Sequence, residues 1–521
     1  MIAIVVSRAD SASEHIGERL LAVGDWERRE DETRSDAAGG GTYYRTEGFE
    51  LREFDDLHIE LDDPAAAFGG GGDRGGAGDA AGDAAPDFLV FVSRHSGETG
   101  RLLTAHVTGN FGPAPYGGEP ETLATAAPGA EKRVVEALAT RAPDGYDVGI
   151  ECTHHGPTSV SVPSLFVELG SDEPQWEDSG AAEAVARAVL DLRGTGPDLV
   201  GDGAADATDG AVQATDGAVQ ATDGAVQATD GAAQVTDGTA QATDESSRHD
   251  DSPRHVVGFG GGHYAPRFTR IVRDTAWAVG HVGADWALGE MGAPEANRET
   301  IDQAFARSRA DRAVIEGDRP DLAAVVEALG HRVVSETWVR EVGDRPLPLI
   351  ERLEADLATV DEGLRFGEIL PAESGAGAIR IRELPDALLS RAQGIDPEAT
   401  REAVASNAVA FDTEQAGTRA AGAAAFDDRA DAPGYGDLVD DLAAVLAERY
   451  DAVEAGDDAV VAREAAFDPD LARDRGVPEG PAFGRLADGE TIEADGETVA
   501  PEDVSRSRTD RFPIDGKDTE E

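Results

Sequence analysis

Short apolar runs alternate with helical segments through the first 340 of the 521 residues, and this alternation most constrains the fold. We expect helices at residues 11–23, opened by a capping pair of Ser11 and Glu14, and at 132–140, 181–192 and 323–329. Strands alternating with helices form a largely parallel sheet. The sequence predicts an α/β domain with a mixed, largely parallel sheet and flanking helices. Its strands are expected at residues 2–6, 88–92, 102–107, 146–153, 165–169 and 255–259, and near Val333.

A seven-residue repeat, TDGAVQA, runs from about Thr208 to Asp244. Each copy carries a glycine, an aspartate and at most one large apolar side chain, so no coiled-coil seam exists. The repeat predicts an acidic, flexible spacer. We therefore divide the chain into residues 1–197 (first part of the core, with a flexible loop at 64–86), 198–254 (acidic linker), 255–341 (second part of the core) and 342–521 (α+β C-terminal extension without an assigned role).

Within the extension, a helix is expected at residues 346–357, and residues 438–455 are amphipathic.

Acidic residues outnumber basic ones by 104 to 45, for a formal net charge of −59. Such charge destabilises a compact fold unless salt screens it, and the Debye length falls to about 3 Å at 1 M. The composition therefore indicates a halophilic protein. Nothing approaches the roughly 20 apolar residues of a membrane span, and MIAIVV is too short for a signal-peptide core. We expect a soluble, cytoplasmic protein, and a locally basic RNA site is not excluded.

The chain has one cysteine, Cys152. This excludes a disulfide framework and any zinc site built from several cysteines.

Histidines follow several of the predicted strands. His95 comes after FLVFVSR, His106 ends LLTAH, Glu151 precedes His154 and His155 in IECTHH, and His263 follows a strand and three glycines. In open α/β sheets ligands bind outside the carboxyl ends of strands, so these histidines are expected to converge on one crevice. Several histidines with a carboxylate favour zinc or another borderline divalent metal, or acid–base catalysis.

The neighbouring pair His154 and His155 sets a geometric condition. Adjacent residues on a regular strand point to opposite faces. Both histidines therefore reach one metal only if the strand ends before them.

The run Gly258 to His263 begins like a dinucleotide-binding fingerprint, but His263 occupies the last glycine position. A redox cofactor is therefore not expected. We expect Gly260, Gly261 and Gly262 to form a turn that a substrate approaches closely, with amide N–H groups available to an anion.

Five motifs in order, SRH (93–95), LTAHVTGN (103–110), THHGPT (153–158), VPS (162–164) and GGGHYAP (260–266), resemble the archaeal and plant type of D-aminoacyl-tRNA deacylase. The resemblance covers residues 1–340 apart from the two loops. It implies zinc dependence, a fold akin to peptidyl-tRNA hydrolases and nucleoside phosphorylases, and hydrolysis of the ester joining a D-amino acid to tRNA, which removes mischarged tRNA. Cys152, where an alanine-like residue is expected, and the long linker depart from the family pattern.

The resemblance also implies roles for particular residues. Metal ligands are sought among His154, His155, His263, Glu151 and His95, and catalytic groups among His154, His155, His106, Thr108 and Asn110. Gly260, Gly261, Gly262 and Tyr264 are expected to bind substrate. The implied cofactor is zinc and the implied partner is tRNA carrying a D-amino acid, with no membrane and no dedicated protein partner.

Two other functions stay open at this point. One is a metal-dependent hydrolase or phosphorylase that acts on nucleosides or small amides. The other is a non-catalytic RNA-binding protein that uses the acidic repeat as its interaction tail. Release of amino acid from charged tRNA, compared with turnover of nucleosides, separates the enzymatic alternatives.

Overall fold

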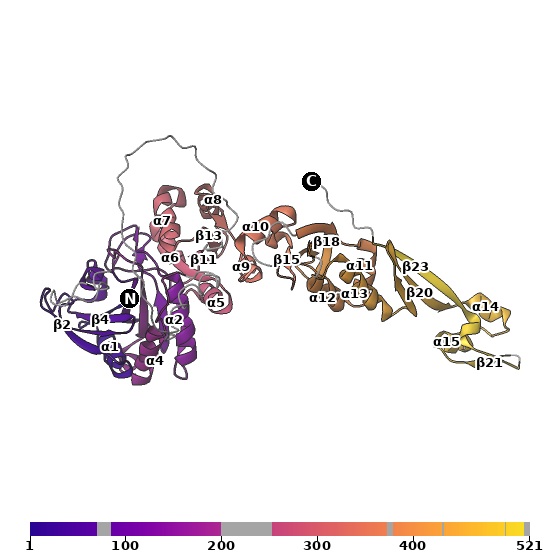
Figure 1. The fold of residues 1–521 in the computed structure, drawn as a ribbon, viewed down its shortest axis with the longest axis horizontal. Helices are drawn as coiled ribbons and strands as arrows, with labels where there is room; N and C mark the ends of the chain where they lie inside the picture. The colour runs from indigo at the N-terminus through magenta and orange to yellow at the C-terminus, as the bar shows by residue number, and fades with distance from the viewer. Residues whose placement is uncertain (70–84, 199–252, 372–378, 430–431, 495, 515–521) are drawn as a thin grey trace, which may run out of the picture. The chain divides into compact units, whose positions relative to one another are not determined.

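The structure, a computed structural model, describes residues 1–521 except 70–84, 199–252, 372–378, 430–431, 495 and 515–521 (Figure 1). Its contacts divide the chain into two compact units, Met1–Glu336 and Thr337–Glu521. Among the described residues, no helix is long and apolar enough to cross a membrane. The expected linker lies almost wholly outside the described residues, so the proposed division of the chain stays a prediction.

An eight-stranded sheet forms the centre of the first unit, in the order β2-β3-β4-β1-β5-β10-β6-β9. Neighbours are parallel from β4 through β1 and β5 to β10, and again between β6 and β9. The strands β2, β3 and β4 form an antiparallel edge, and β6 is antiparallel to β10. The predicted mixed α/β sheet is confirmed. Its strands are β1 (Ile2–Ser7), β2 (Glu27–Asp31), β3 (Gly41–Thr46), β4 (Phe49–Phe54), β5 (Phe88–Arg94), β6 (Leu102–His106), β9 (Asp147–Ile150) and β10 (Ser164–Gly170).

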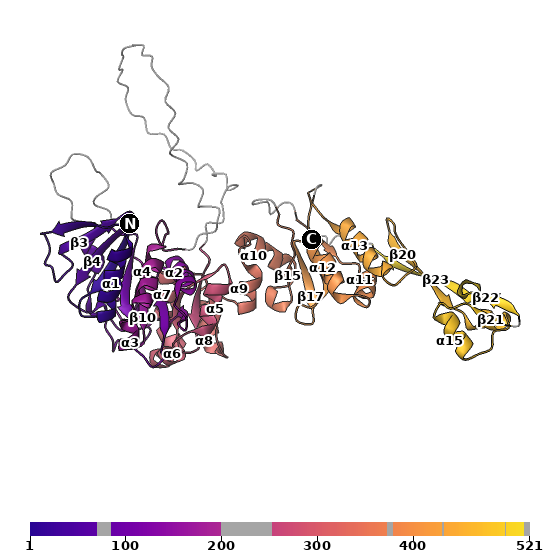
Figure 2. The same cartoon turned by 90° about the horizontal axis from the view of Figure 1, so that it is seen from below.

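One face of this sheet is covered by α1 (Ser11–Val23), α2 (Pro128–Arg141) and α4 (Ser179–Leu190), which lie side by side in Figures 1 and 2. The expected capping pair at α1 is wrong. The carboxylate of Asp10, one residue earlier, accepts hydrogen bonds from the backbone N–H groups of Ala12 and Ser13. An aspartate side chain in this position satisfies two N–H groups that the first helical turn leaves free.

The opposite face of the sheet is apolar near β1 and β5, where Val5, Phe91 and Phe166 pack in one buried cluster. The expected flexible loop at 64–86 differs at its start, because residues Pro64–Ala67 form a 3-10 helix and Ala65, Ala67 and Phe68 are buried in this cluster. Their apolar side chains cover the sheet. Residues 70–84 lie outside the described part of the chain.

A second, four-stranded parallel sheet in the first unit has the order β12-β11-β13-β14. Phe259 and Phe305 lie in its core. The predicted single sheet is therefore divided in two. Its elements are β11 (His255–Phe259), α5 (Pro266–Asp274), β12 (Ala278–Gly283), α6 (Asp285–Met291), α7 (Arg298–Ser308), β13 (Arg312–Ile315), α8 (Pro320–Ala328) and β14 (Arg332–Val333).

The second unit mixes helices with antiparallel sheets, as expected for an α+β extension. The helix expected at 346–357 is α10 (Leu347–Asp356), while the amphipathic segment 438–455 divides into α13 (Tyr435–Ala447) and β19 (Ala452–Ala455). The other main elements are α9 (Glu336–Val342), β15 (Arg365–Phe366), β16 (Ile379–Glu383), α11 (Asp386–Gln393), α12 (Pro397–Asn407), β17 (Ala410–Glu414), β18 (Arg419–Asp427), β20 (Ala459–Phe467), α14 (Pro469–Asp474), α15 (Pro481–Ala487), β21 (Ile492–Ala494), β22 (Glu497–Val499) and β23 (Ser505–Pro513).

Candidate active site

His95, Glu151 and Glu168 form a buried charged group in the first unit. His95 follows β5, Glu168 lies within β10 and Glu151 follows β9. The His95 Nδ1 atom lies 3.1 Å from Glu151 Oε1 and 3.4 Å from Glu168 Oε2. Thr104 in β6 donates a hydrogen bond of 2.6 Å to Glu151 Oε1. Because buried carboxylates are costly unless partnered, these contacts are what allow both to stay charged in the interior.

The strands that carry these groups run in two directions. β6 and β9 are antiparallel to β5 and β10, so the expected histidines lie together, but not because the carboxyl ends of parallel strands meet at one edge. The side chains meet because of strand register instead. Glu168 pairs with Thr104, and Phe166 pairs with His106, across the β10–β6 ladder. Residues two apart on a strand share a face, which places the site on the face of the sheet.

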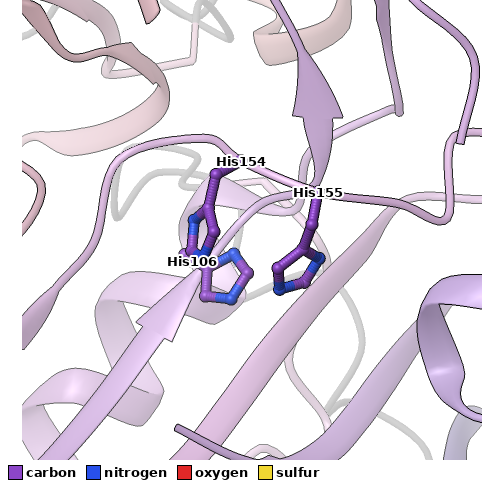
Figure 3. A group of neighbouring side chains, drawn as sticks. All are labelled: His106, His154 and His155. Carbon is purple, nitrogen blue, oxygen red and sulfur yellow. The ribbon is translucent and has the colours of Figure 1, made fainter. Parts of the chain in front are cut away.

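Three imidazoles cluster beside this charged group (Figure 3). The ring centroid of His106 lies 4.5 Å from that of His154 and 4.9 Å from that of His155. The centroids of His154 and His155 are 4.4 Å apart. The strand β9 ends at Ile150, and His155 has a left-handed backbone with φ of 50°. The condition for neighbouring histidines to reach one point is therefore met.

Each of the three rings is oriented by a backbone carbonyl. The Nδ1–H groups of His154 and His155 donate to the carbonyls of Cys152 (2.8 Å) and Gly156 (2.6 Å). His106 Nδ1 lies 3.2 Å from its neighbour's carbonyl, that of Val107. This turns the Nε2 atoms away from these carbonyls and leaves them available to a metal, the arrangement that metal-binding histidines use.

Burial and nearby carboxylates act oppositely on His95 and His106. Burial lowers the pKa of His95, but hydrogen bonds to Glu151 and Glu168 outweigh it and raise that pKa to about 10. Glu168 similarly raises the pKa of His106 against the effect of burial. Burial raises the pKa of Glu168, yet the imidazoles of His106 and His95 beside it bring that pKa down to about 2. The cluster thus holds charges of both signs.

His154 and His155 differ from those two histidines. Burial, together with the positive charge of neighbouring imidazoles, lowers the pKa of His154 well below its usual range and that of His155 to about 4. Both rings are neutral at pH 7, so their lone pairs are available to a ligand.

His263 joins the site from the second sheet. Its Nε2 atom lies 2.8 Å from Glu151 Oε2, and its backbone carbonyl accepts a hydrogen bond from the Cys152 N–H. Cys152 Sγ lies 3.6 Å from His263 Nδ1. Burial raises the pKa of the Cys152 thiol to about 12, so the thiol is neutral and behaves as a small buried side chain.

The described residues contain three groups whose ligand atoms all lie within 4.8 Å of one another. Among them, His106, His154 and His155 fit a metal best, because they offer imidazole nitrogens and because His106 Nε2, although buried, has no hydrogen-bond partner. Glu168 Oε1 lies 3.5 Å from that atom, too far for a good hydrogen bond. The other two groups are His95, Glu151 and Glu168, and Cys152, His154 and His263.

Comparisons with known proteins agree with this geometry. A family model described as D-aminoacyl-tRNA deacylase matches residues 83–206 and 224–334, which include every site residue predicted from the sequence. A D-aminoacyl-tRNA deacylase of Halorubrum lacusprofundi is 70% identical over 99% of this chain and 97% of its own length. The chain belongs to the D-aminoacyl-tRNA deacylase family.

More distant relatives extend the match. A D-aminoacyl-tRNA deacylase of Natronomonas pharaonis is 49% identical over 98% of this chain and 100% of its own length. Another, of Methanoregula boonei, is 32% identical over 82% of this chain and 86% of its own. A crystal structure of a conserved protein of unknown function aligns with a TM-score of 0.47 and 26% identity, covering 65% of this chain and 96% of that one. The haloarchaeal relatives agree with the halophilic composition.

Two residues predicted as catalytic groups hydrogen-bond to the backbone in this family member. Thr108 Oγ1 donates to the carbonyl of Pro157 at 2.9 Å. Asn110 Nδ2 donates to the carbonyls of Gly117 and Glu119, at 3.0 and 3.2 Å. A catalytic role of these two side chains stays a prediction.

The glycine turn lies against a carboxylate. A Cβ atom at Gly260 or Gly261, which have φ values of 95° and 80°, would meet Glu316 at 2.4 or 2.6 Å. The Gly260 N–H donates to the carbonyl of Gly283. Crowding by Glu316 is therefore one reason for glycine here, and Gly262 has open space. Tyr264 Oη lies 3.3 Å from His95 Nε2 at the edge of the site.

Glu168 and Thr104 were not predicted from the sequence. Glu168 is the one charged residue in the strand SLFVELG, and this is the signal that would have found it. A carboxylate buried in an otherwise apolar strand requires a partner.

Proposed function

We propose that this chain hydrolyses the ester that joins a D-amino acid to the terminal ribose of tRNA, releasing free amino acid and tRNA. Family membership supports this function over the nucleoside-directed and non-catalytic alternatives. The observation that carries the chemistry is the convergence of His106, His154 and His155 with their Nδ1 atoms turned to backbone carbonyls. We propose that the enzyme acts in the cytoplasm, where aminoacyl-tRNA is made.

We assign the metal to the Nε2 atoms of His106, His154 and His155, and identify it as zinc because three imidazoles suit a borderline divalent ion. When bound, zinc supplies a Lewis acid for the ester carbonyl and lowers the pKa of water to about 7. The His95 group is less suited to this role, since its charges already satisfy one another. The group of Cys152, His154 and His263 offers only two imidazoles, against three in the group assigned here.

The other residues of the site transfer protons or hold the charged side chains in place. His263 is half-buried and oriented by Glu151, which suits it to accept a proton from the attacking water and pass it to the ribose oxygen that leaves. Thr104 fixes the other oxygen of Glu151. The positive charge of His95 holds both carboxylates in place and lies near the developing negative charge.

The decisive experiment assays D- and L-aminoacyl-tRNA hydrolysis in molar KCl, with and without chelator. We expect faster hydrolysis of the D-ester and loss of activity with chelator. His154→Ala and His155→Ala should each lower the rate at least about 100-fold, the scale of losing a ligand or proton-transfer group. Both should also lower bound zinc, measured by mass spectrometry on the same preparations.

His331→Gln is the matched control, because this histidine stacks on Phe305 away from the site and should keep its zinc and its rate. Full metal content and near-normal rates in both alanine variants would show that the pair is structural. Equal hydrolysis of D- and L-esters would contradict the D-specific function.

A further inference from the structure

Aromatic rings lie exposed beside the histidine pair. Of the described large hydrophobic side chains, four are markedly exposed: Trp286 at 42%, Tyr116 at 65%, Tyr264 at 36% and Leu370 at 62%. Trp286 and Tyr116 line one pocket with His154 and His155. Contact of large aromatic rings with water costs free energy. Two exposed rings beside the same pair of histidines therefore indicate that a ligand covers them.

Backbone contacts connect both rings to the site. Trp286 lies in α6, where the neighbouring Asp285 N–H donates to the Gly261 carbonyl at 2.9 Å. The Tyr116 carbonyl accepts a hydrogen bond of 3.1 Å from the Gly156 N–H, immediately after His155. The backbone that carries each ring is therefore held beside the histidines.

The pocket itself is small, about 10 Å³, which is room for about one water molecule. A nucleobase does not fit inside it and must lie at its mouth, on the exposed ring faces. Among the described residues that line it there is no lysine or arginine, and Glu290 contributes a carboxylate. This lining suits a flat, uncharged group and repels a phosphate.

We propose that Trp286, assisted by Tyr116, is the stacking platform for the unpaired base of the tRNA nucleotide that carries the amino acid. The inference rests on the proposed function, since it requires an aminoacyl ester at the histidines. A ring face stacks on any base through its π-system. Stacking also suits a chain of net charge −59, because contacts to phosphate lose affinity steeply as salt rises.

The test uses two stable probes in molar KCl: D-alanine joined by an amide to the 3′ position of adenosine, and the same amide on a ribose that lacks the base. Calorimetry measures the dissociation constant of each. We expect the wild-type protein to bind the adenosine probe about tenfold more tightly or better, on the scale of one stacked base. Trp286→Ala should abolish that preference, Tyr116→Ala should reduce it, and Trp286→Phe should retain most of it.

Leu370→Ala is the control, since it removes an exposed apolar side chain outside the pocket and should leave the base preference unchanged. Circular dichroism in the same salt establishes that each variant is folded. A folded Trp286→Ala protein that keeps the full base preference would overturn the proposal. The proposal would also be overturned if Trp286→Ala kept the base preference and instead changed the preference for a D-phenylalanine probe over a D-alanine probe. The rings would then contact the amino-acid side chain and not the base.

Hydrolysis of D-aminoacyl-tRNA by the wild-type protein separates this proposal from the proposed function. If the ester is hydrolysed while the base preference is absent, only the stacking platform is wrong. If no aminoacyl-tRNA is hydrolysed, the proposed function is wrong, and the two probes still decide whether Trp286 binds a base.

Discussion

Glu168 connects the two parts of the site at the scale of single residues. Its oxygens lie 3.4 Å from His95 Nδ1 and 3.5 Å from His106 Nε2, so one carboxylate contacts both the charged group and the histidine cluster. The contact is to the same Nε2 atom that would bind the metal, so Glu168 holds the ring in place in the metal-free protein and would add a negative charge beside a bound cation. Glu168 is therefore a positioning residue for His106.

Glu168→Gln should lower hydrolysis by about 10- to 100-fold, the range for partners that orient metal ligands. It should also raise the zinc dissociation constant, a readout that a purely structural role would not change. The measurements are steady-state rates and metal titration. A wild-type rate together with a wild-type zinc dissociation constant would contradict the positioning role. Glu131→Gln is the control, since Glu131 is also buried but lies outside the site.

Glu131, in the first turn of α2, is 1% exposed, and its Oε2 atom has no hydrogen-bond partner among the described residues. Burial raises its pKa well above the usual range. The folded protein therefore keeps this proton while the unfolded chain releases it, so stability falls as pH rises above the unfolded pKa of about 4.3 towards the folded one. At neutral pH this glutamate destabilises the fold.

Glu131→Gln should raise the melting temperature at pH 7 by about 2 °C or more, since glutamine is uncharged in both states and needs no proton uptake on folding. The gain should shrink as the pH approaches 4. Thermal unfolding in molar KCl across this pH range measures it. The exposed Glu14→Gln in α1 is the control and should show no gain, and a destabilised Glu131→Gln would contradict the argument.

The histidines could be found from sequence because each follows a recognisable apolar strand. Glu168 could have been noticed as the one charged residue of its strand, but its partners could not, because which face of a strand carries a site depends on neighbouring strands that are distant in sequence. The two exposed rings were missed for a similar reason. Tyr116 and Trp286 are 170 positions apart by their numbering, and only the fold brings them to one pocket.

At the scale of elements, most strands and helices of the first unit were predicted, but strand direction was not. Apolar periodicity reports burial and length and says nothing about direction. The reversal of β6 and β9 relative to β5 therefore had no sequence signal. The edge strand β2, ERRED, and its neighbour β3, GTYYRT, were missed because neither contains an apolar run.

Asp10 links one element to the site. One carboxylate oxygen caps α1, and the other accepts a hydrogen bond of 2.9 Å from the N–H of Arg94, next to His95. Asp10→Ala should cost about 1–2 kcal/mol of stability for the cap and lower hydrolysis about tenfold or more, because His95 shifts. Urea unfolding and steady-state rates measure the two effects.

Asp396 provides the matched control, since it caps α12 through the N–H groups of Glu398 and Ala399 in the other unit. Asp396→Ala should lose similar stability and keep the wild-type rate. Wild-type activity in the Asp10 variant would show that the bond to Arg94 does not position His95.

Deletion of residues 208–244 should leave activity nearly unchanged. The repeat has no burial pattern, and each doubling of loop length changes the free energy of closure by only about 0.6 kcal/mol. The rate of the deletion variant against D-aminoacyl-tRNA measures this. Loss of most activity in a folded variant would contradict the spacer interpretation.

At the scale of the whole molecule, the net charge of −59 should make folding depend on salt. At 0.01 M salt the Debye length grows to about 30 Å, and the acidic groups repel one another across the molecule. The melting temperature by circular dichroism should fall steeply as KCl is diluted. Sucrose of equal osmolarity is the control for non-ionic effects and should not restore the melting temperature. A melting temperature independent of KCl would contradict the halophilic interpretation.

His263 reaches Glu151 and Cys152 across more than 100 residues, and 54 of those positions, 199–252, separate the described parts of the first unit. A ribosome adds about 5–20 residues per second, so these positions alone delay the synthesis of His263 by about 3–11 s. During that time Glu151 has emerged without its partner from the second sheet. On the proposed role of His263, a nascent chain is inactive until the second sheet has been made, and the added length of chain delays the first moment at which the enzyme can work.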